Sequence, residues 1–221
     1  MNHVKEPVFA FAIILVLSTT LVVSARDSDP LVEGAILRLE ARGAIVKPFR
    51  VAELGIEGNV VRLGDENDGR LLTPAGKIDP AVVADLKAIP ELLLEIRGPS
   101  FANAGLNDLL ALKNMLGLDV AGTKVTRDAL PDIAKMQSLR LLDLSFDEID
   151  GKSLAALASL NGLQFLALID TRLDDSAVRP LRELKSLRYL EMGGTNLSPR
   201  GQESVQEALK ACQIRWPARR R

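Results

Sequence analysis

The sequence contains one cysteine and one histidine, and this scarcity excludes several classes of function. Cys212 has no second cysteine in the chain, so an intramolecular disulfide cannot form. His3 lies in a segment that we expect to be removed, which leaves the remaining chain without an imidazole. Ser-His-Asp catalysis, Cys-His catalysis and the usual His/Cys zinc site are therefore excluded there. We expect no cofactor and no metal ion.

The sequence is also poor in aromatic residues, at 4%, and has no excess of either charge. Lys and Arg number 28 against 29 Asp and Glu, for a net charge of −1. Nucleic-acid binding usually requires a basic face, so we expect no nucleic-acid partner. The single basic cluster, at 218–221, is predicted to be a solvated basic tail. The 221 residues suffice for one domain or one compact repeat array.

The amino-terminal segment, residues 1–25, is the one place with a long apolar run. Residues 8–17 are uninterrupted apolar residues, Lys5 precedes them, and short residues at 23–25 permit cleavage after Ala25. This pattern predicts a signal peptide. A membrane anchor remains the alternative, because 8–25 reaches the lower length limit for a membrane span. Either reading predicts an exported protein that is periplasmic, secreted or envelope-anchored, and the lack of disulfides favours a bacterial envelope or exterior.

Beyond the amino-terminal segment the sequence repeats with a step of 24 residues. The stretch 187–197 reads LRYLEMGGTNL, and 163–173 reads LQFLALIDTRL. Three apolar columns keep this step: Leu94, Leu118, Leu142, Leu166, Leu190 and Ile214; Ile96, Val120, Leu144, Leu168, Met192 and Trp216; and Phe101, Val125, Ile149, Leu173 and Leu197. A fixed period of this length indicates a stacked repeat architecture.

Each period predicts a strand, a turn and a helix. Within 165–169, the column residues Leu166 and Leu168 alternate with residues that face the other way, which predicts a strand. Residues 174–176 are Asp and Ser, which favour a helix start. A helix that returns the chain makes successive strands parallel. We therefore predict five 24-residue units plus a terminal strand within 81–217. No unit can bury its own apolar face, but the stack can.

Residues 26–80 are predicted to form an amino-terminal cap. Asp29 followed by Pro30 indicates a helix start, and the helix is expected over 30–42. Short apolar pieces in 44–63 indicate strands, whereas the detailed structure of 44–80 is left open. The acids at 64–69 lack the ligand order of a calcium-binding EF-hand, so a solvated turn is the preferred interpretation.

The repeating unit L-x-x-L-x-L-x-x-[N/C/T]-x-L resembles the leucine-rich repeat family, closely over 112–216 and loosely over 88–101. The position usually held by asparagine carries Pro99, Thr123, Asp147, Thr171 and Thr195, which is similar to ribonuclease-inhibitor-like repeats. The resemblance implies an α/β solenoid with a curved parallel β-sheet on its concave face, helices on its convex face, and a helix and hairpin as the amino-terminal cap. It also implies a protein partner bound on the concave sheet, because most family members bind proteins there.

Residues between the apolar columns are expected to face the concave side. They predict an apolar and aromatic patch of Leu141, Phe165, Ile169 and Tyr189, with acids alongside it at Glu95, Asp119, Asp143 and Glu191. Exposed aromatic surface favours docking of a partner. The alternative is that these strand-forming residues simply fill space between neighbouring strands. The acids either attract a basic partner or keep the sheet face soluble, and the sequence favours neither.

The predicted function is a non-catalytic, exported protein–protein interaction module. One alternative is a membrane-anchored structural or scaffold protein of the envelope, held through residues 8–25. A second is a carboxylate-based hydrolase, because acids in one column on adjacent strands lie roughly 5 Å apart. A deep cleft or a strongly raised carboxylate pKa would favour the hydrolase. The sequence identifies neither the partner nor the oligomeric state.

Overall fold

The structure, a computed structural model, describes residues 29–64 and 71–217. The predicted signal peptide or anchor at 1–25, the basic tail at 218–221 and nearly all of the acidic turn at 64–69 lie outside the described residues. Within the described ranges, no helix combines the length and apolar character needed to cross a membrane.

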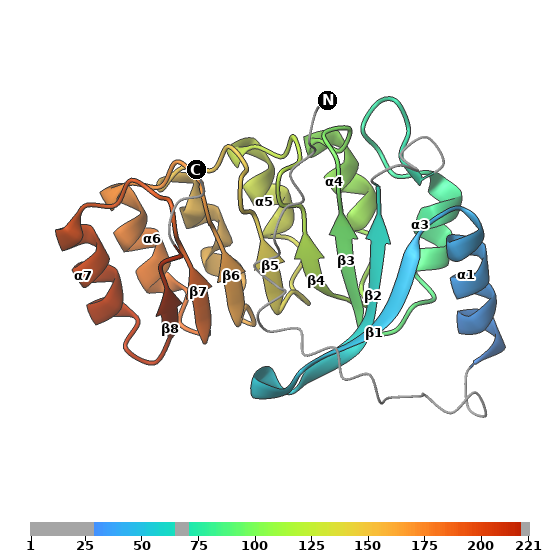
Figure 1. The fold of residues 1–221 in the computed structure, drawn as a ribbon, viewed down its shortest axis with the longest axis horizontal. Coiled ribbons are helices and arrows are strands. Elements are labelled where there is room, and N and C mark those ends of the chain that lie inside the picture. Colours follow the sequence, from blue (N-terminus) through green and yellow to red (C-terminus); the bar gives the residue numbers. More distant parts are fainter. Residues whose placement is uncertain (1–28, 65–70, 218–221) are drawn as a thin grey trace.

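One eight-stranded sheet runs through the molecule, with its strands side by side in chain order (Figure 1). The strands are β1 (Ile45–Val51), β2 (Ile56–Leu63), β3 (Leu92–Ile96), β4 (Met115–Asp119), β5 (Leu141–Asp143), β6 (Phe165–Ala167), β7 (Tyr189–Glu191) and β8 (Gln213–Arg215). β1 pairs antiparallel with β2, and every later pair is parallel. The sheet therefore combines one hairpin with a parallel stack.

Apart from η2, which joins β1 to β2, the helical segments form a second layer along one side of this sheet (Figure 1). The α-helices are α1 (Pro30–Ala41), α3 (Pro80–Leu86), α4 (Asn103–Leu109), α5 (Leu130–Ile133), α6 (Val178–Glu183) and α7 (Pro199–Ala208). The 3₁₀ segments are η2 (Ala52–Leu54), η4 (Arg127–Ala129), η5 (Ser153–Ser159) and η6 (Asp175–Ala177). Asp29 is confirmed as the residue that caps the start of α1, because its carboxylate accepts the Leu31 N–H at 2.9 Å. The repeat that follows β5 carries only the 3₁₀ segment η5 where a helix was expected.

Strand pairing confirms the step of 24 residues. In β4 to β8, Gly117 pairs with Leu141, Leu141 with Phe165, Phe165 with Tyr189, and Tyr189 with Gln213. A parallel sheet with one return segment for each strand is the leucine-rich repeat solenoid that the resemblance implied. The α/β fold prediction is therefore confirmed.

The three apolar columns form the interior of the solenoid. Leu94, Leu118, Leu142, Leu166 and Leu190 are all completely buried, and so are their neighbours two residues further on, from Ile96 to Met192. Ile214 and Trp216, which continue these columns at β8, are only partly buried, because no described repeat lies beyond them. The interior of each repeat is thus completed by its neighbour.

The turn that follows each strand requires a left-handed backbone. At the equivalent position of five repeats, φ is 96° at Gly98, 69° at Gly122, 64° at Phe146, 52° at Asp170 and 71° at Gly194. Glycine adopts this conformation without strain, whereas a residue with a side chain loses roughly 1–2 kcal/mol there. Aspartate tolerates it better than phenylalanine does. Phe146 is therefore the least suited of the five residues to its own backbone.

The hairpin of β1 and β2 extends past the sheet as a two-stranded arm, which we define as residues 49–58. β2 pairs with β3 only over 59–63, so the arm has no ladder of hydrogen bonds to the rest of the sheet. Figure 1 shows its tip curving away from β2 toward the side of β5 and β6. At its base, an added Cβ on Gly58 would lie 2.1 Å from the Glu91 carbonyl oxygen, so glycine is needed for this close approach.

Side chains hold the arm against the concave sheet. Phe49, Val51 and Ile56 belong to one buried apolar cluster with Leu141 of β5 and Phe165 of β6. This cluster is separate from the solenoid interior and lies on the other face of the sheet, as the alternation of side chains along a strand requires. The arm thus covers part of the concave surface that the sequence predicted to be exposed.

Removal of a column side chain should destabilise the solenoid far more than removal of a turn side chain. We expect Leu166→Ala to lower the free energy of unfolding by about 2–5 kcal/mol, because it opens a cavity in the buried interior. Arg172→Ala removes an exposed ion pair with Glu148 and should cost about 0.5 kcal/mol or less. Urea denaturation measures both changes. Similar small losses in the two variants would contradict the repeat register.

Candidate functional site

The predicted aromatic patch is only half accessible. Leu141 and Phe165 are 1% and 0% exposed, so the expectation that they form part of an exposed docking surface is wrong. The physical reason is the arm, whose apolar side chains pack in the same cluster. Ile169 and Tyr189 lie at the border of that cluster and remain half-buried. These two residues are the part of the patch that stays within reach of a partner.

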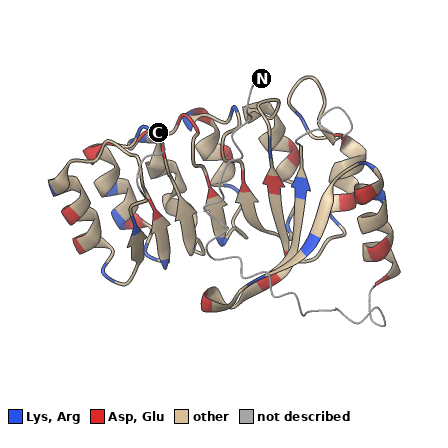
Figure 2. Cartoon of the chain, viewed as in Figure 1, with Lys and Arg blue, Asp and Glu red and all other residues tan. Residues whose placement is uncertain are grey.

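The predicted acidic column is present near the carboxyl ends of β3, β4, β5 and β7, where Figure 2 shows acidic residues on successive strands. Its members are Glu95, Asp119, Asp143 and Glu191, and each is at most 2% exposed. The expectation of an accessible acidic strip beside the patch is therefore wrong. A buried carboxylate must be paired or protonated, because burial without a partner is costly.

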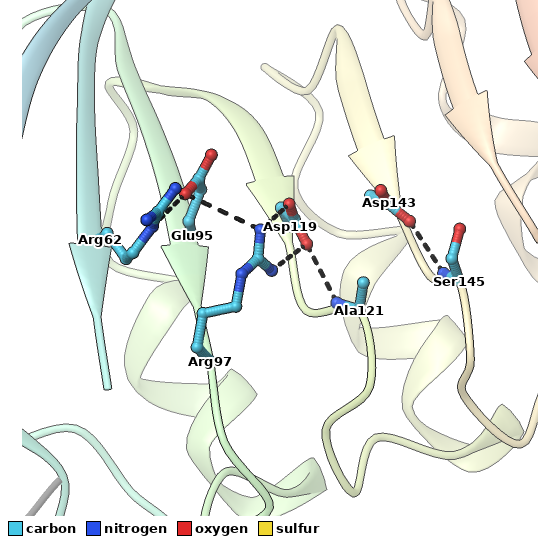
Figure 3. Close-up of polar contacts among 7 residues, drawn as sticks. All are labelled: Arg62, Glu95, Arg97, Asp119, Ala121, Asp143 and Ser145. Atoms are coloured by element: carbon cyan, nitrogen blue, oxygen red, sulfur yellow. Dashed lines mark hydrogen bonds and ion pairs between the residues drawn. The ribbon is translucent and has the colours of Figure 1, made fainter. Parts of the chain in front are cut away.

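Two arginines neutralise the first part of the column (Figure 3). The Arg97 guanidinium donates two hydrogen bonds to the Asp119 carboxylate, at 2.6 and 2.5 Å, and lies 3.7 Å from Glu95. Arg62 of β2 donates from Nε to Glu95 at 2.7 Å. Burial alone would lower the pKa of Arg97, but Asp119, Glu95 and Asp143 together outweigh this effect and the net pKa is raised. Such a bidentate pair is geometrically specific.

The later acids of the column, Asp143 and Glu191, are less well neutralised by arginine. Burial raises the pKa of Asp143, and the neighbouring Asp119 raises it further. The Ser145 N–H, which donates to Asp143 at 2.8 Å, acts in the opposite direction. Burial also raises the pKa of Glu191, whose nearest cation is Arg215 at 3.7 Å. Burial, together with Asp119, also raises the pKa of Glu95 at β3, although Arg97 and Arg62 act against this rise. The column therefore differs along its length in its arginine partners, while burial raises the carboxyl pKa at β3, β5 and β7.

Asp147 shows the same effect inside the turn. It occupies the position held by Thr171 and Thr195 in later repeats, whose hydroxyls donate to the carbonyls of Leu168 and Met192 at 2.7 and 3.0 Å. One oxygen of Asp147 accepts the Thr123 N–H at 3.0 Å, and the other is buried without a hydrogen-bond partner. Burial raises the pKa of Asp147 to about 9. A neutral carboxyl therefore fills a position that suits a hydrogen-bond donor.

Sequence reasoning did not identify the roles of three residues: Arg62, Arg97 and Phe146. The repeat step of 24 residues places the end of β3, which Arg97 follows, beside the end of β4. The sequence therefore held a signal for the pairing of Arg97 with Asp119. Arg62 lies before the first recognisable repeat, so the period gave no signal for it. Phe146 falls at a turn position outside the three apolar columns, where the sequence pattern carries no information on backbone strain.

The described residues contain no group of three or more His, Cys, Asp or Glu side chains placed to hold a metal ion. Cys212 is half-buried just before β8, and burial raises its pKa to about 11, so its thiol stays protonated near neutral pH. The acidic column lines neither of two pockets found among the described residues. One is lined by Glu53, Leu54, Gln164, Arg188, Tyr189, Ala211 and Gln213, and the other by Arg127, Asp128, Pro131, Asp150, Lys152, Ser153 and Ala156.

Comparison with known proteins gives matches among solved structures only; no family model and no curated protein matches the chain. A leucine-rich repeat protein of Leptospira interrogans is 21% identical, with 63% of this chain and 34% of that chain covered and a TM-score of 0.44. Internalin C2 of Listeria monocytogenes is 19% identical, with coverages of 63% and 57% and a TM-score of 0.42. Internalin F of the same organism is 18% identical, with coverages of 83% and 54% and a TM-score of 0.43. The chain spans less than two thirds of the length of each.

The buried ion pairs give the first testable consequence of this geometry. Arg97→Met leaves Asp119 and Glu95 buried without their shared cation and should lower the free energy of unfolding by about 3–5 kcal/mol at neutral pH. Arg62→Met is the matched control, because Arg62 is 28% exposed and water can replace part of its interaction. Urea denaturation of both variants checks the difference. Equal losses would contradict a buried role for Arg97.

Asp147 gives a second consequence, which depends on pH. Its folded pKa lies above its unfolded value, so the folded state binds an extra proton and stability falls as pH rises from about 4 toward 9. Asp147→Asn supplies an uncharged amide donor at every pH and should raise stability at pH 8 by about 1 kcal/mol or more. Denaturation at pH 5 and pH 8 should show that the gain is larger at the higher pH. A gain that does not change with pH would mean that Asp147 is ionised in the folded protein.

Proposed function

We propose that this chain, which folds as a leucine-rich repeat solenoid, is a non-catalytic module that binds a protein partner on the concave side of its sheet. The observation that carries the proposal is the border between the arm and the later strands. Tyr189 and Ile169 are half-buried there, at the edge of the apolar cluster. A half-buried aromatic ring beside a curved sheet is a favourable anchor for a protein surface.

A pocket at this border supports a protein rather than a small molecule as the ligand. Leu54 of the arm tip and Tyr189 of β7 line it, together with Gln164, Arg188 and Gln213. Its volume is about 240 Å³, below the range of about 300–1,000 Å³ that is usual for small-molecule sites. A pocket of this size suits one side chain of a partner, with the two carboxamides and Arg188 available to its polar atoms.

Hydrolysis by a carboxylate pair is a second candidate, favoured by one observation. The pKa of Asp143 is raised by burial and by Asp119 on the adjacent strand, as a general acid would require. Binding remains the better-supported function, because Arg97 already occupies the Asp119 carboxylate and Asp143 is only 2% exposed. A substrate would have to displace buried, paired groups before reaching them.

The proposal includes export. The apolar run at 8–17, with short residues at 23–25, supports a signal peptide, and an uncleaved anchor at 8–25 would turn the module into an envelope-attached scaffold. The binding surface proposed here is the same in both cases, because it lies on β6, β7 and the arm.

Capture with a concave-face variant tests the proposed function. The full chain serves as bait in native extract, beside Tyr189→Ser, which removes the half-buried ring of β7 that lines the pocket with Leu54 of the arm tip. Arg182→Ser on α6 is the matched control, because it removes an exposed side chain from the helical layer. We expect a protein that is retained by the wild type and by Arg182→Ser but lost with Tyr189→Ser.

Each other result contradicts the proposal in a defined way. A partner retained equally by all three baits would place binding outside the concave sheet. Circular dichroism of each bait excludes loss of fold as the cause of lost capture. Hydrolytic activity that is abolished by Asp143→Asn would replace the binding function with the second candidate.

A further inference from the structure

Two opposite charges on the concave side are unpaired in the part of the chain that the structure describes. Glu53 lies in η2 at the arm tip, where Figure 2 shows acidic residues, and Arg188 directly precedes β7. Both residues are exposed, and neither side chain makes a hydrogen bond or an ion pair with another described residue. The other acid of the arm, Glu57, lies 3.8 Å from Arg50. The charges of Glu53 and Arg188 are therefore available to a ligand.

These two residues line one pocket, the acid from the arm and the base from the sheet. Glu53 and Leu54 form its arm side. Arg188 lies on its sheet side, beside Gln164 and Gln213 at the starts of β6 and β8. Main-chain hydrogen bonds fix this side, because the Arg188 N–H donates to the Gln164 carbonyl at 2.8 Å. The Gln213 N–H donates to the Arg188 carbonyl, also at 2.8 Å. The pocket thus combines a carboxylate and a guanidinium that do not pair with each other.

A pocket with one charge of each sign discriminates among the side chains of a partner. Its volume of about 240 Å³ suits one side chain, so a single group has to satisfy both charges. A carboxylate would be repelled by Glu53, and an ammonium or guanidinium group by Arg188. An apolar side chain would remove water from both charges without replacing the lost hydrogen bonds. A carboxamide satisfies both, because its nitrogen donates to a carboxylate while its oxygen accepts from a guanidinium.

We propose that the protein partner inserts an asparagine or glutamine side chain into this pocket, which we call the carboxamide pocket. The amide nitrogen of the partner donates to the Glu53 carboxylate, and its amide oxygen accepts from the Arg188 guanidinium. The half-buried Tyr189 ring packs against the methylene groups, and Gln164 and Gln213 complete the polar rim. This inference rests on the proposed function and names the chemical group that the pocket selects.

The carboxamide pocket predicts a ranking of peptides that differ in one side chain. Random linear peptides displayed on phage are selected on the wild-type full chain. An enriched peptide is then synthesised in three forms, with its Asn or Gln kept, replaced by Glu, or replaced by Lys. Fluorescence anisotropy measures the affinity of each form. We expect the carboxamide form to bind about tenfold more tightly than either charged form, because it alone satisfies both charges of the pocket.

Two variants of the pocket should shift this ranking in opposite directions. Glu53→Gln leaves Arg188 as the single charge among the lining residues, so the form with Glu should become the tightest binder. Arg188→Gln leaves Glu53, so the form with Lys should become the tightest binder. Both residues are exposed, so neither change should unfold the chain. Glu57→Gln is the matched control and should keep the wild-type ranking, because it neutralises an arm acid that does not line the pocket.

Three results would overturn the inference. The wild type could enrich no peptide, the enriched peptides could lack a shared Asn or Gln, or Glu53→Gln and Arg188→Gln could keep the wild-type ranking. The proposed function is tested separately by the capture experiment. A natural partner that is lost with Tyr189→Ser, together with an unchanged peptide ranking in both pocket variants, would leave the concave-face function standing and remove the carboxamide pocket alone.

Discussion

The structure depends on an interior that no repeat can complete by itself. Each unit contributes one layer of Leu, Ile, Val or Met to columns that are sealed only when the next unit stacks on it. The parallel ladder from β4 to β8 keeps this stacking in one register. Any slip of one residue in that ladder would turn the apolar columns toward the concave side. Register is therefore the constraint from which the other features follow.

Register also stacks residues that repel one another, and the concave column shows how this chain resolves the conflict. Same-column carboxylates on adjacent strands are held near each other by the backbone whatever their charges. At β3 and β4 the solution is a shared arginine, since Arg97 contacts both Glu95 and Asp119. At β5 the raised pKa of Asp143 favours the neutral acid, and at β6 the column holds Ala167 instead. The column is therefore part of the buried structure, although the sequence pattern alone suggests an acidic surface.

The repeats were predictable in register because their signal is periodic, whereas in the cap the helix and the hairpin were predicted but the packing of the arm was not. Leu94 and its column could be assigned with their burial, since a period constrains every member at once. The pairing of the arm with Leu141 and Phe165 depends on contacts between a hairpin and strands far along the chain, and no local pattern encodes them. For that reason the patch was placed on the correct face of the sheet, but two of its four residues, Leu141 and Phe165, were predicted to be exposed and are buried. Phe146 was missed because a left-handed φ angle leaves no trace in hydrophobic periodicity.

The arm has a consequence for the order in which the molecule folds. Its apolar residues precede β3, yet they pack against β5 and β6, so the arm closes a long stretch of chain when it docks. During synthesis the arm emerges before the strands that will cover it exist. Contacts so distant in sequence form late, whereas neighbouring repeats can assemble locally. An early-made part of the fold is thus expected to reach its final place late, and until then its apolar face is available to chaperones and to other chains.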